Sequence, residues 1–552
     1  MVVQNKKILP IGKDDFRMIR ESEFEHYYVD KTLMIQDFIQ YSNFVTLITR
    51  PRRFGKTLNM TMIRDFFDIT QDSHAIFEGL AIMNTGCAKK INSAPVISLS
   101  LKGCTGRNVE TLIESVGIEV RKEYTRYAKI LAGVDKTDYS YRGYFHVLTA
   151  LESGTITENE LKYSLEYLLQ ALYTYYGVKP ILLIDEYDNP IIEAHQQDFR
   201  NEFTRFYGAF LTLALKGNPH LGQAMLTGIQ RVAKESIFSK LNNIVNIVVY
   251  NVLSKHYAPY FGLTTEETSE LLNHYDLDLT EDVKRRYDGY LFGGFEMYNP
   301  WSILGYANER ILKTYWLKTS TNALISESVL AADKQFHRSF ERLIKNEKVD
   351  VTLNLEASFA ELPQNDTLWG LFVNAGYLTV TDADYELNNF TVKIPNTEIK
   401  TEFQSIVGRY TKLSSQLLND MLVALTRGQM EDFMEVYEAL VLRSTSYYDA
   451  KEHAYHMLML GMLMNLQDLY KIQSNIESGY GRSDIIMESL DQKRPHIIIE
   501  FKQGEDVEKL KHEALEQIHK NKYYADLEGE ILLIGLAHHI KKCQLVHEII
   551  TK

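Results

Sequence analysis

Short apolar runs alternate with stretches of helical periodicity through the first half of the chain. The longest helical stretch covers residues 109–176, with predicted breaks at Gly133 and Gly143. The apolar runs are rich in β-branched residues and predict buried strands at 44–49, 95–101, 180–186, 223–227 and 244–250. Strands and helices that alternate in this way predict an α/β fold, with a parallel sheet and crossover helices, over residues 1–255.

The pattern becomes mainly helical after this region. Residues 261–322 have helical spacing around a turn-rich block at 287–294. Asn299 followed by Pro300 is typical of a helix start, since asparagine caps the helix and proline fits its first position. We therefore expect a helical lid over residues 256–325.

Residues 326–430 combine helices with a predicted β-hairpin. Its two strands, at 376–380 and 389–394, flank a polar turn. Helices around a hairpin predict a winged-helix-like module, followed by connecting helices. Such a module either binds DNA or packs between domains, and packing is favoured here because no basic recognition helix is evident.

The last segment, residues 431–552, returns to mixed α/β periodicity. After a helical pattern at 446–467, the predicted elements are a strand that Asp484 opens, a strand at 496–502, a helix at 507–524 and a strand at 530–535. We expect a separate C-terminal α/β domain.

Composition restricts the binding partners and the cellular compartment that we expect for this protein. Three distant cysteines, Cys87, Cys104 and Cys543, favour reduced thiols in a cytoplasmic protein over a disulfide or zinc framework. No apolar run is long enough for a membrane helix, so no membrane partner is expected. The net charge of −13 argues against broad nucleic-acid coating, although a local basic groove remains compatible with it.

A phosphate-binding loop is predicted between the first strand and the next helix. The run Arg50-Pro51-Arg52-Arg53-Phe54-Gly55-Lys56-Thr57 has Arg50 where the usual motif has its first glycine. Lys56 would reach the phosphates of ATP, and Thr57 would bind Mg²⁺. The loop and helix start would supply the other nucleotide contacts, from Arg52, Arg53, Phe54, Gly55 and Leu58. The alternative is a basic turn before a surface helix.

Two acidic residues end the strand at 180–186. Asp185 would hold the Mg²⁺ shell, and Glu186 would orient or deprotonate the attacking water. Asp188 lies close by in the sequence and is a further candidate to assist them. A polar residue at the end of the next strand can sense the γ-phosphate. Thr227 is the candidate and Arg231 the second, although a structural turn and a surface charge explain these two residues equally well.

The C-terminal segment carries a second constellation of charged residues. Asp484 and Glu500 lie at ends of two neighbouring predicted strands, and Lys502 shares a face with Glu500. Two carboxylates can hold Mg²⁺, which activates water, and an ammonium can stabilise charge on a phosphodiester. Glu452 is a candidate third carboxylate, and Gln517 and Tyr523 are predicted to line the same cleft. The alternative is a solvated edge strand with an ordinary salt bridge.

The two constellations together resemble a bacterial family, the AAA-ATPase-like proteins with a C-terminal PD-(D/E)XK nuclease-type domain. The resemblance is carried by the segments 28–32, 50–57, 184–188, 481–484 and 500–502. It implies an ASCE-type, AAA-like P-loop core and a restriction-endonuclease-like C-terminal fold. In segment 28–32, Asp30, Lys31 and Thr32 either cap the following helix or approach the nucleotide.

Two functions follow as hypotheses. The first is an ATPase that is also a magnesium-dependent nuclease, with ATP controlling how the C-terminal domain meets DNA or RNA. The second is an NTP-dependent switch or scaffold whose C-terminal domain binds nucleic acid or a protein without cutting. Many ATPases of this class complete their site with an arginine from a neighbouring subunit, so a homo-oligomer is compatible with both.

Overall fold

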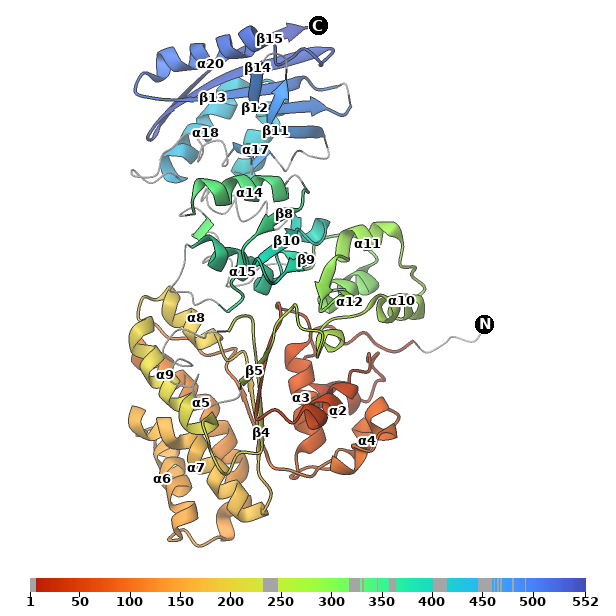
Figure 1. Cartoon of the computed structure of the whole chain (residues 1–552), viewed down its shortest axis with the longest axis vertical. Coiled ribbons are helices and arrows are strands. Elements are labelled where there is room, and N and C mark those ends of the chain that lie inside the picture. The colour runs from red at the N-terminus through yellow and green to blue at the C-terminus, as the bar shows by residue number, and fades with distance from the viewer. Residues whose placement is uncertain are drawn as a thin grey trace. The chain divides into compact units, whose positions relative to one another are not determined.

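The computed structural model describes residues 6–231, 247–316, 328–329, 332–344, 346–356, 364–400, 415–444, 459–460, 462–463, 466, 469–478, 481–491 and 493–552. The chain divides into two compact units (Figure 1). Unit 1 contains Met1–Leu324 and Asn346–Ile399, and unit 2 contains Ile325–Lys345 and Lys400–Lys552. Within the described residues, no helix is both long and apolar enough to span a bilayer.

The first sheet of unit 1 has five parallel strands in the order β2-β3-β4-β1-β5. The strands are β1 (Val45–Thr49), β2 (Val96–Ser100), β3 (Ile181–Asp185), β4 (Gln223–Gly228) and β5 (Ile247–Tyr250). All five predicted strands are present, although residues 244–246 lie outside the described part of the chain. Strand β4 lies between β1 and β3, and a five-stranded parallel sheet is consistent with the predicted P-loop core.

Helices cover both faces of this sheet. Figure 1 shows α2 (Leu33–Tyr41), α3 (Lys56–Phe67) and α4 (His74–Phe77) on one side, and α5 (Val109–Ala128), α6 (Tyr139–Ser153), α7 (Glu158–Tyr176) and α9 (Arg200–Leu215) on the other. Leucines and tyrosines of the second group pack with Val45, Leu47 and Leu182 in the main core. Burial of these apolar faces stabilises the layered arrangement.

One predicted helix break is wrong. Gly133 ends a short 3₁₀ helix, but Gly143 lies inside α6. A Cβ at Gly143 would lie 2.6 Å from the ring of Tyr167 on α7. The glycine is therefore explained by the close packing of α6 on α7, and α6 ends instead at Gly154, which has a left-handed backbone.

The rest of unit 1 contains short helices and two small sheets. The helices are α8 (Asn189–Gln196), α10 (Thr265–His274), α11 (Glu281–Tyr287), α12 (Pro300–Glu309) and α15 (Asn365–Ala375). Asn299 caps α12, as predicted, by accepting the amide of Trp301 at 2.9 Å. Strand β6 (Tyr290–Phe292) lies in the turn-rich block and forms a hairpin with β7 (Phe295–Met297), which directly follows the block.

A three-stranded antiparallel sheet contains the hairpin predicted for the middle of the chain. Strands β9 (Thr379–Asp384) and β10 (Asn389–Lys393) form that hairpin, and β8 (Val349–Val351) pairs with the other edge of β10. Helix α15 precedes β9. The identity of this region as a winged-helix module stays a prediction.

The sheet of unit 2 has the order β11-β12-β13-β14-β15 and is mixed. Its strands are β11 (Tyr470–Ser478), β12 (Gly481–Ser489), β13 (His496–Gln503), β14 (Glu530–His539) and β15 (Lys542–Thr551). Only the β13–β14 pair is parallel, and α20 (Val507–Asn521) forms the crossover between these two strands. The other named helices are α14 (Lys334–Ile344), α17 (Ser415–Thr426) and α18 (Met430–Ser444).

Helix α20 can lie close to this sheet because β14 carries Gly535. A Cβ at this glycine would lie 2.3 Å from the carbonyl oxygen of Lys511 and 2.8 Å from the amide nitrogen of Leu515. Ile518 of α20 packs with Ile498 and Leu533 of the sheet in the local core. The glycine therefore sets the distance between the helix and the strands.

The substitution Gly535→Ala is expected to push α20 away from β14, because the new methyl group overlaps the helix backbone. The free energy needed to open the hydrogen bonds of α20 is expected to fall by about 1–3 kcal/mol. Hydrogen–deuterium exchange of the full chain, read on α20 peptides, measures this change. Gly86→Ala is the control, since a Cβ there meets nothing within 4 Å. Unchanged exchange in α20 would contradict the packing argument.

Candidate functional site

The loop between β1 and α3 positions a lysine at the start of the helix. Gly55 has φ +83°, a left-handed conformation that a side chain would disfavour, and Lys56 begins α3. The Lys56 side chain is buried, and its Nζ donates to the carbonyl oxygens of Arg50 (3.0 Å) and Pro51 (2.9 Å). Burial lowers the pKa of Lys56, although Glu186, Asp185 and Asp188 favour its charged form.

Three predicted residues from three elements meet at the ends of the central strands. Thr57 Oγ1 donates to Asp185 Oδ2 at 2.6 Å, and Thr227 Oγ1 donates to Asp185 Oδ1. The Asp185 carboxylate is 4% exposed. A hydroxyl and a carboxylate next to a helix N-terminus are hard oxygen donors that suit Mg²⁺ bound to a nucleotide. The described residues at this site therefore fit the predicted cofactors.

Asp188 connects the ends of β3 and β4. Its Oδ2 accepts the amides of Ile229 (2.8 Å) and Gln230 (2.9 Å), and a Cβ at Gly228 would lie 2.6 Å from its Oδ1. Burial raises the pKa of Asp188 to about 6, with the two amides acting in the opposite direction. These contacts indicate that Asp188 holds the turn that directly follows β4, the strand that contains Thr227.

Glu186 lies between the two aspartates with φ +51°, an uncommon conformation for a residue with a side chain. The next residue, Tyr187, donates its amide to the Thr227 carbonyl at 3.0 Å and its hydroxyl to the Gln230 carbonyl at 2.8 Å. The backbone that presents Glu186 is thus fixed on its C-terminal side. Its predicted role with the attacking water stays a prediction.

Other predicted nucleotide-binding residues have side chains engaged elsewhere in unit 1. The Arg53 guanidinium lies 4.3 Å from the ring centre of Trp301, and Phe54 is fully buried. Arg52 and Leu58 are half-buried beside them. The buried Phe54 can meet a phosphate through its backbone amide, whereas the exposed Arg53 guanidinium keeps its N–H groups while it stacks on Trp301. Arg231 forms an ion pair with Glu356 at 2.5 Å.

The segment Asp30–Thr32 connects neighbouring parts of unit 1. Thr32 precedes α2 without a capping bond from its side chain, and its hydroxyl accepts the Ile82 amide at 3.1 Å. The Asp30 carboxylate accepts the Thr32 amide at 2.8 Å. Lys31 Nζ binds both carboxylate oxygens of Glu267, at 2.5 and 2.6 Å. These contacts favour a structural role for the segment.

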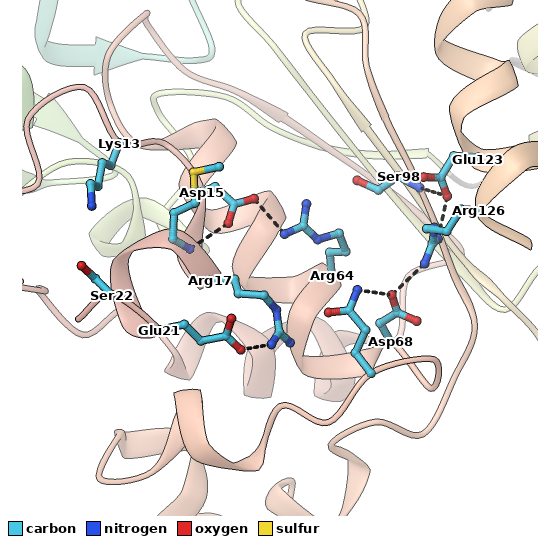
Figure 2. Close-up of a pocket in the computed structure, with 12 residues that line it drawn as sticks. Lys13, Asp15, Arg17, Glu21, Ser22, Arg64, Asp68, Ser98, Glu123 and Arg126 are labelled. Carbon is cyan, nitrogen blue, oxygen red and sulfur yellow. Dashed lines mark hydrogen bonds and ion pairs between the residues drawn. The ribbon is translucent and has the colours of Figure 1, made fainter. Parts of the chain in front are cut away.

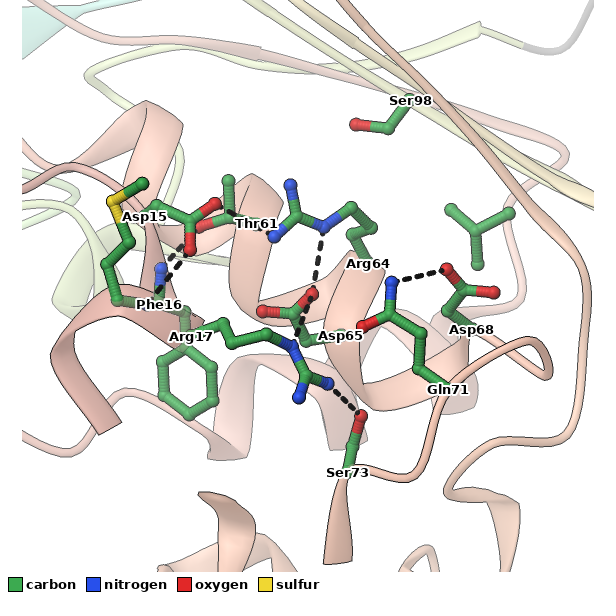
Figure 3. Close-up of polar contacts among 12 residues, drawn as sticks. Asp15, Phe16, Arg17, Thr61, Arg64, Asp65, Asp68, Gln71, Ser73 and Ser98 are labelled. Atoms are coloured by element: carbon green, nitrogen blue, oxygen red, sulfur yellow. Dashed lines mark hydrogen bonds and ion pairs between the residues drawn. The ribbon is translucent and has the colours of Figure 1, made fainter. Parts of the chain in front are cut away.

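A separate polar pocket of about 580 Å³ lies beside α3 in unit 1 (Figure 2). Arg64 donates to Asp15 (2.9 Å) and to Asp65 (2.8 Å), as Figure 3 shows. Arg126 pairs with Asp68 at 2.7 Å and with Glu123 at 2.6 Å. The charges that line this pocket are largely neutralised by each other.

The second half of this network closes the free edge of β2. The Val96 amide donates to the hydroxyl of Tyr127 at 3.1 Å, and the Ser98 amide donates to Glu123 at 3.2 Å. Arg126 and the Tyr127 hydroxyl both donate to the Val96 carbonyl. Covering an edge strand blocks pairing with another chain. We therefore assign these charged residues to the fold.

In unit 2 the predicted acids converge across the β12–β13 pair. The Asp484 amide donates to Glu500 Oε2 at 3.2 Å, and the Phe501 amide donates to Asp484 Oδ2 at 2.7 Å. Neighbouring pairs Ile485–Ile499 and Ile486–Ile498 set the register that places the two acids opposite each other. The Glu500 side chain is 2% exposed. The predicted convergence of Asp484 and Glu500 is therefore present.

Gln517 of α20 joins the lysine to this pair of acids. Lys502 Nζ donates to Gln517 Oε1 at 2.6 Å, and Gln517 Nε2 donates to Glu500 Oε1 and to the Tyr523 hydroxyl. The Tyr523 hydroxyl in turn donates to the Arg482 carbonyl at 2.8 Å. Sequence reasoning placed Gln517 and Tyr523 beside the cleft but missed this bridging role.

Gly481 explains the close approach of β12 to the end of α20. A Cβ there would lie 2.7 Å from Asn521 Nδ2 and 3.3 Å from the Tyr523 hydroxyl. Asn521 donates to that hydroxyl at 2.9 Å. Gly481 therefore allows α20 to bring Gln517 within reach of the strands.

The carboxylates of Asp484 and Glu500 are hard oxygen donors that suit Mg²⁺, which keeps several waters as further ligands. In the part of the chain that the structure describes, no group of three or more histidines, cysteines or acids is placed so that it could hold a metal ion. The predicted third carboxylate, Glu452, lies outside the described residues. The two acids thus fit a partly hydrated ion.

Comparisons with known proteins match the two regions of the chain that carry these residues. Residues 10–238 match a family described as predicted AAA-ATPase, and residues 450–548 match the PD-(D/E)XK nuclease superfamily. These matches confirm the resemblance at both ends of the chain. The chain is also similar to an uncharacterized protein in the vnfD 5′ region of Azotobacter chroococcum mcd 1. The two are 24% identical over 414 residues, which cover 74% of this chain and 71% of that protein.

The raised pKa of Asp188 predicts a pH dependence of stability. Because the folded-state pKa of about 6 exceeds the ordinary value of 3.8, the folded protein binds this proton more tightly than the unfolded chain. The protonated Asp188 therefore adds about 2–3 kcal/mol to the free energy of unfolding below about pH 4, and this contribution is lost as the pH rises through about 6. Asp188→Asn is expected to abolish this component.

Urea unfolding of the full chain from pH 4 to 7, followed by tryptophan emission, tests this difference, since all three tryptophans belong to unit 1. Asp278→Asn, at an exposed position, is the control. Identical pH profiles for wild type and Asp188→Asn would contradict the assignment.

Proposed function

We propose that this chain is an ATP-regulated, metal-dependent nuclease that acts on DNA or RNA. It carries a predicted AAA-ATPase domain at residues 10–238 and a PD-(D/E)XK nuclease superfamily domain at residues 450–548. One observation carries the proposal. Each domain brings its own acids together with a lysine or hydroxyl that suits phosphate chemistry, at Thr57–Asp185–Thr227 and at Asp484–Glu500–Lys502.

In the first site, Lys56 and the amides at the start of α3 bind the phosphates of ATP. Thr57 and Asp185 hold Mg²⁺, which neutralises charge on the phosphates when it is bound. Glu186 orients the attacking water, and Thr227 responds to the γ-phosphate through its bond to Asp185. The contacts among Thr57, Asp185 and Thr227 support these roles.

In the second site, Asp484 and Glu500 would hold the metal ion, which when bound would activate the attacking water and polarise the phosphodiester. Lys502 stabilises negative charge that develops on the phosphate oxygens. Gln517 binds both Glu500 and Lys502 and keeps the acid and the ammonium apart at a fixed separation. The chain of hydrogen bonds from Lys502 to Glu500 supports this arrangement.

A second candidate is an NTP-dependent switch whose C-terminal domain binds nucleic acid or a protein without cleaving. It is favoured by the net charge of −13 and by the hydrogen bonds that already occupy both carboxylate oxygens of Glu500. Under this function, ATP binding changes the affinity for the partner, and no metal ion is expected between Asp484 and Glu500.

For the nuclease site, Lys502→Met is expected to lower cleavage by about 10²- to 10³-fold, because a charge that stabilises the transition state is removed. Glu500→Gln is expected to lower it at least as far. Single- and double-stranded DNA and RNA, incubated with the full chain and Mg²⁺ or Mn²⁺, provide the assay. Lys509→Met and Glu513→Gln, an exposed pair on α20, are matched controls.

Wild-type protein that binds nucleic acid but cuts none of these substrates would favour the second candidate. Cleavage that persists in Glu500→Gln would come from elsewhere and would contradict the assigned site.

For the ATP site, Lys56→Ala is expected to lower ATP turnover by about 10²-fold or more, since the ammonium that meets the phosphates is lost. Phosphate release measured on the full chain gives the rate. Lys90→Ala, at an exposed lysine of unit 1, is the control. Equal turnover in Lys56→Ala and wild type would show that the loop does not bind the nucleotide that is hydrolysed.

A further inference from the structure

The phosphate loop is embedded in residues that follow it much later in the chain. The Arg50 guanidinium is fully buried, donates to the Tyr250 carbonyl at 2.9 Å, and lies 5.6 and 5.4 Å from the ring centres of Phe261 and Phe292. Phe54 is also fully buried, with its ring 5.0 Å from the rings of Tyr290 and Phe292. Aromatic rings therefore enclose both ends of the arginine-rich run.

The middle of the loop contacts the region after α15. A Cβ at Gly376 would lie 2.8 Å from the Cβ of Pro51, and Gly376 has φ +86°. The Tyr290 hydroxyl donates to the Gly376 carbonyl at 3.0 Å. The same tyrosine thus contacts Phe54 and holds the turn that meets Pro51.

Two of the three tryptophans in the chain contact the arginines of this loop. The Arg53 guanidinium lies 4.3 Å from the ring centre of Trp301, and Trp316 Nε1 donates to the Arg52 carbonyl at 3.4 Å. Arg53 has φ +70°, a conformation that residues with a Cβ disfavour. The contact with Trp301 offsets this strain, because a cation over an aromatic face is favourable.

A single buried carboxylate, that of Glu398, binds the two segments that carry Trp301 and Trp316. Glu398 is 2% exposed and accepts the Ser302 hydroxyl (2.7 Å), the Tyr315 amide (2.6 Å) and the Trp316 amide (3.1 Å). Ser302 follows Trp301 directly. Burial raises the pKa of Glu398, with these three hydrogen bonds acting in the opposite direction. A carboxylate at this position therefore joins the two segments that contact Arg52 and Arg53.

We infer that Trp301, Trp316 and Glu398 are positioning residues for the phosphate loop, which they hold in the conformation that binds ATP. The inference rests on the proposed nucleotide site and extends it to residues outside the P-loop core. A conventional loop obtains its shape from glycines, whereas this loop has arginines and a proline before Gly55 and obtains its shape from tertiary contacts.

Two of these residues lie near the points in the sequence where the chain crosses from unit 1 to unit 2. The chain enters unit 2 after Leu324 and again after Ile399. Trp316 precedes the first passage, and Glu398 lies directly before the second. The residues that contact the loop therefore lie near both points in the sequence where the chain leaves unit 1.

Affinity for a fluorescent ATP analogue with Mg²⁺ tests the inference on the full chain. Trp301→Leu, at a half-exposed position, is expected to raise the Kd about two- to fivefold by removing the cation–π contact. Glu398→Ala is expected to raise it about tenfold, since three hydrogen bonds to a charged group are lost. Glu398→Gln is expected to restore most of the affinity, because its amide can serve the same three partners.

Glu386→Ala, at an exposed position in the turn between β9 and β10, is the matched control and should bind as wild type does. If Glu398→Ala does not fold, Trp301→Leu decides the test. Unchanged or tighter binding in folded variants would overturn this inference alone. Absence of ATP binding by wild type would overturn the proposed nucleotide site and this inference with it.

Tryptophan emission supplies an independent readout. Addition of ATP and Mg²⁺ is expected to change the emission of wild type and of Trp369→Phe, whose tryptophan packs on Phe372 in α15. The double substitution Trp301→Phe with Trp316→Phe is expected to remove that change. An ATP-dependent change that persists in the double variant, or that wild type lacks, would contradict the role of these two tryptophans.

Discussion

Strand β4 lies between β1 and β3, and this strand order determines where the candidate nucleotide-binding residues meet. Parallel pairing aligns the carboxyl ends of all three strands at one edge of the sheet. Asp185 at the end of β3 therefore faces Thr57 of α3 and Thr227 of β4, and it accepts a hydrogen bond from each hydroxyl. Asp188 fixes the same edge by binding the amides that follow β4.

The C-terminal site depends on an analogous close contact between a helix and a sheet. Gly535 lets α20 lie against β14, and Gly481 lets β12 approach the end of the same helix. Gln517 can then bridge Glu500 and Lys502. In both sites, groups that are distant in sequence become neighbours because strand ends or glycines bring backbones together.

Much of this arrangement could be predicted from local sequence patterns. Runs of β-branched residues identified the five strands of the first sheet, and the spacing of Glu500 and Lys502 placed both on one face of β13. Strand β15 was not predicted, because it mixes polar and apolar residues without clear alternation. Strand β11 was missed although its apolar residues Tyr470, Ile472 and Ile476 alternate with polar ones. The role of Gly143 was misjudged because its neighbour Tyr167 belongs to another helix.

The residues that hold the phosphate loop had no local signal. Trp316 and Arg52 are 264 positions apart, and Glu398 contacts Ser302 across 96 positions. Such contacts follow from how segments pack in three dimensions, which periodicity and motif spacing do not encode. The Arg50 substitution in the glycine motif was the one hint that this loop needs support from outside the core.

The two metal-assisted phosphate sites proposed for this chain can be counted by electron paramagnetic resonance of Mn²⁺, titrated into the full chain with and without ATP. Without ATP, one Mn²⁺ is expected to bind, and Asp484→Ala is expected to remove it. With ATP, a second Mn²⁺ is expected to bind, and Thr57→Ala is expected to remove it. Equal Mn²⁺ stoichiometry in wild type and both variants would rule out these two sites.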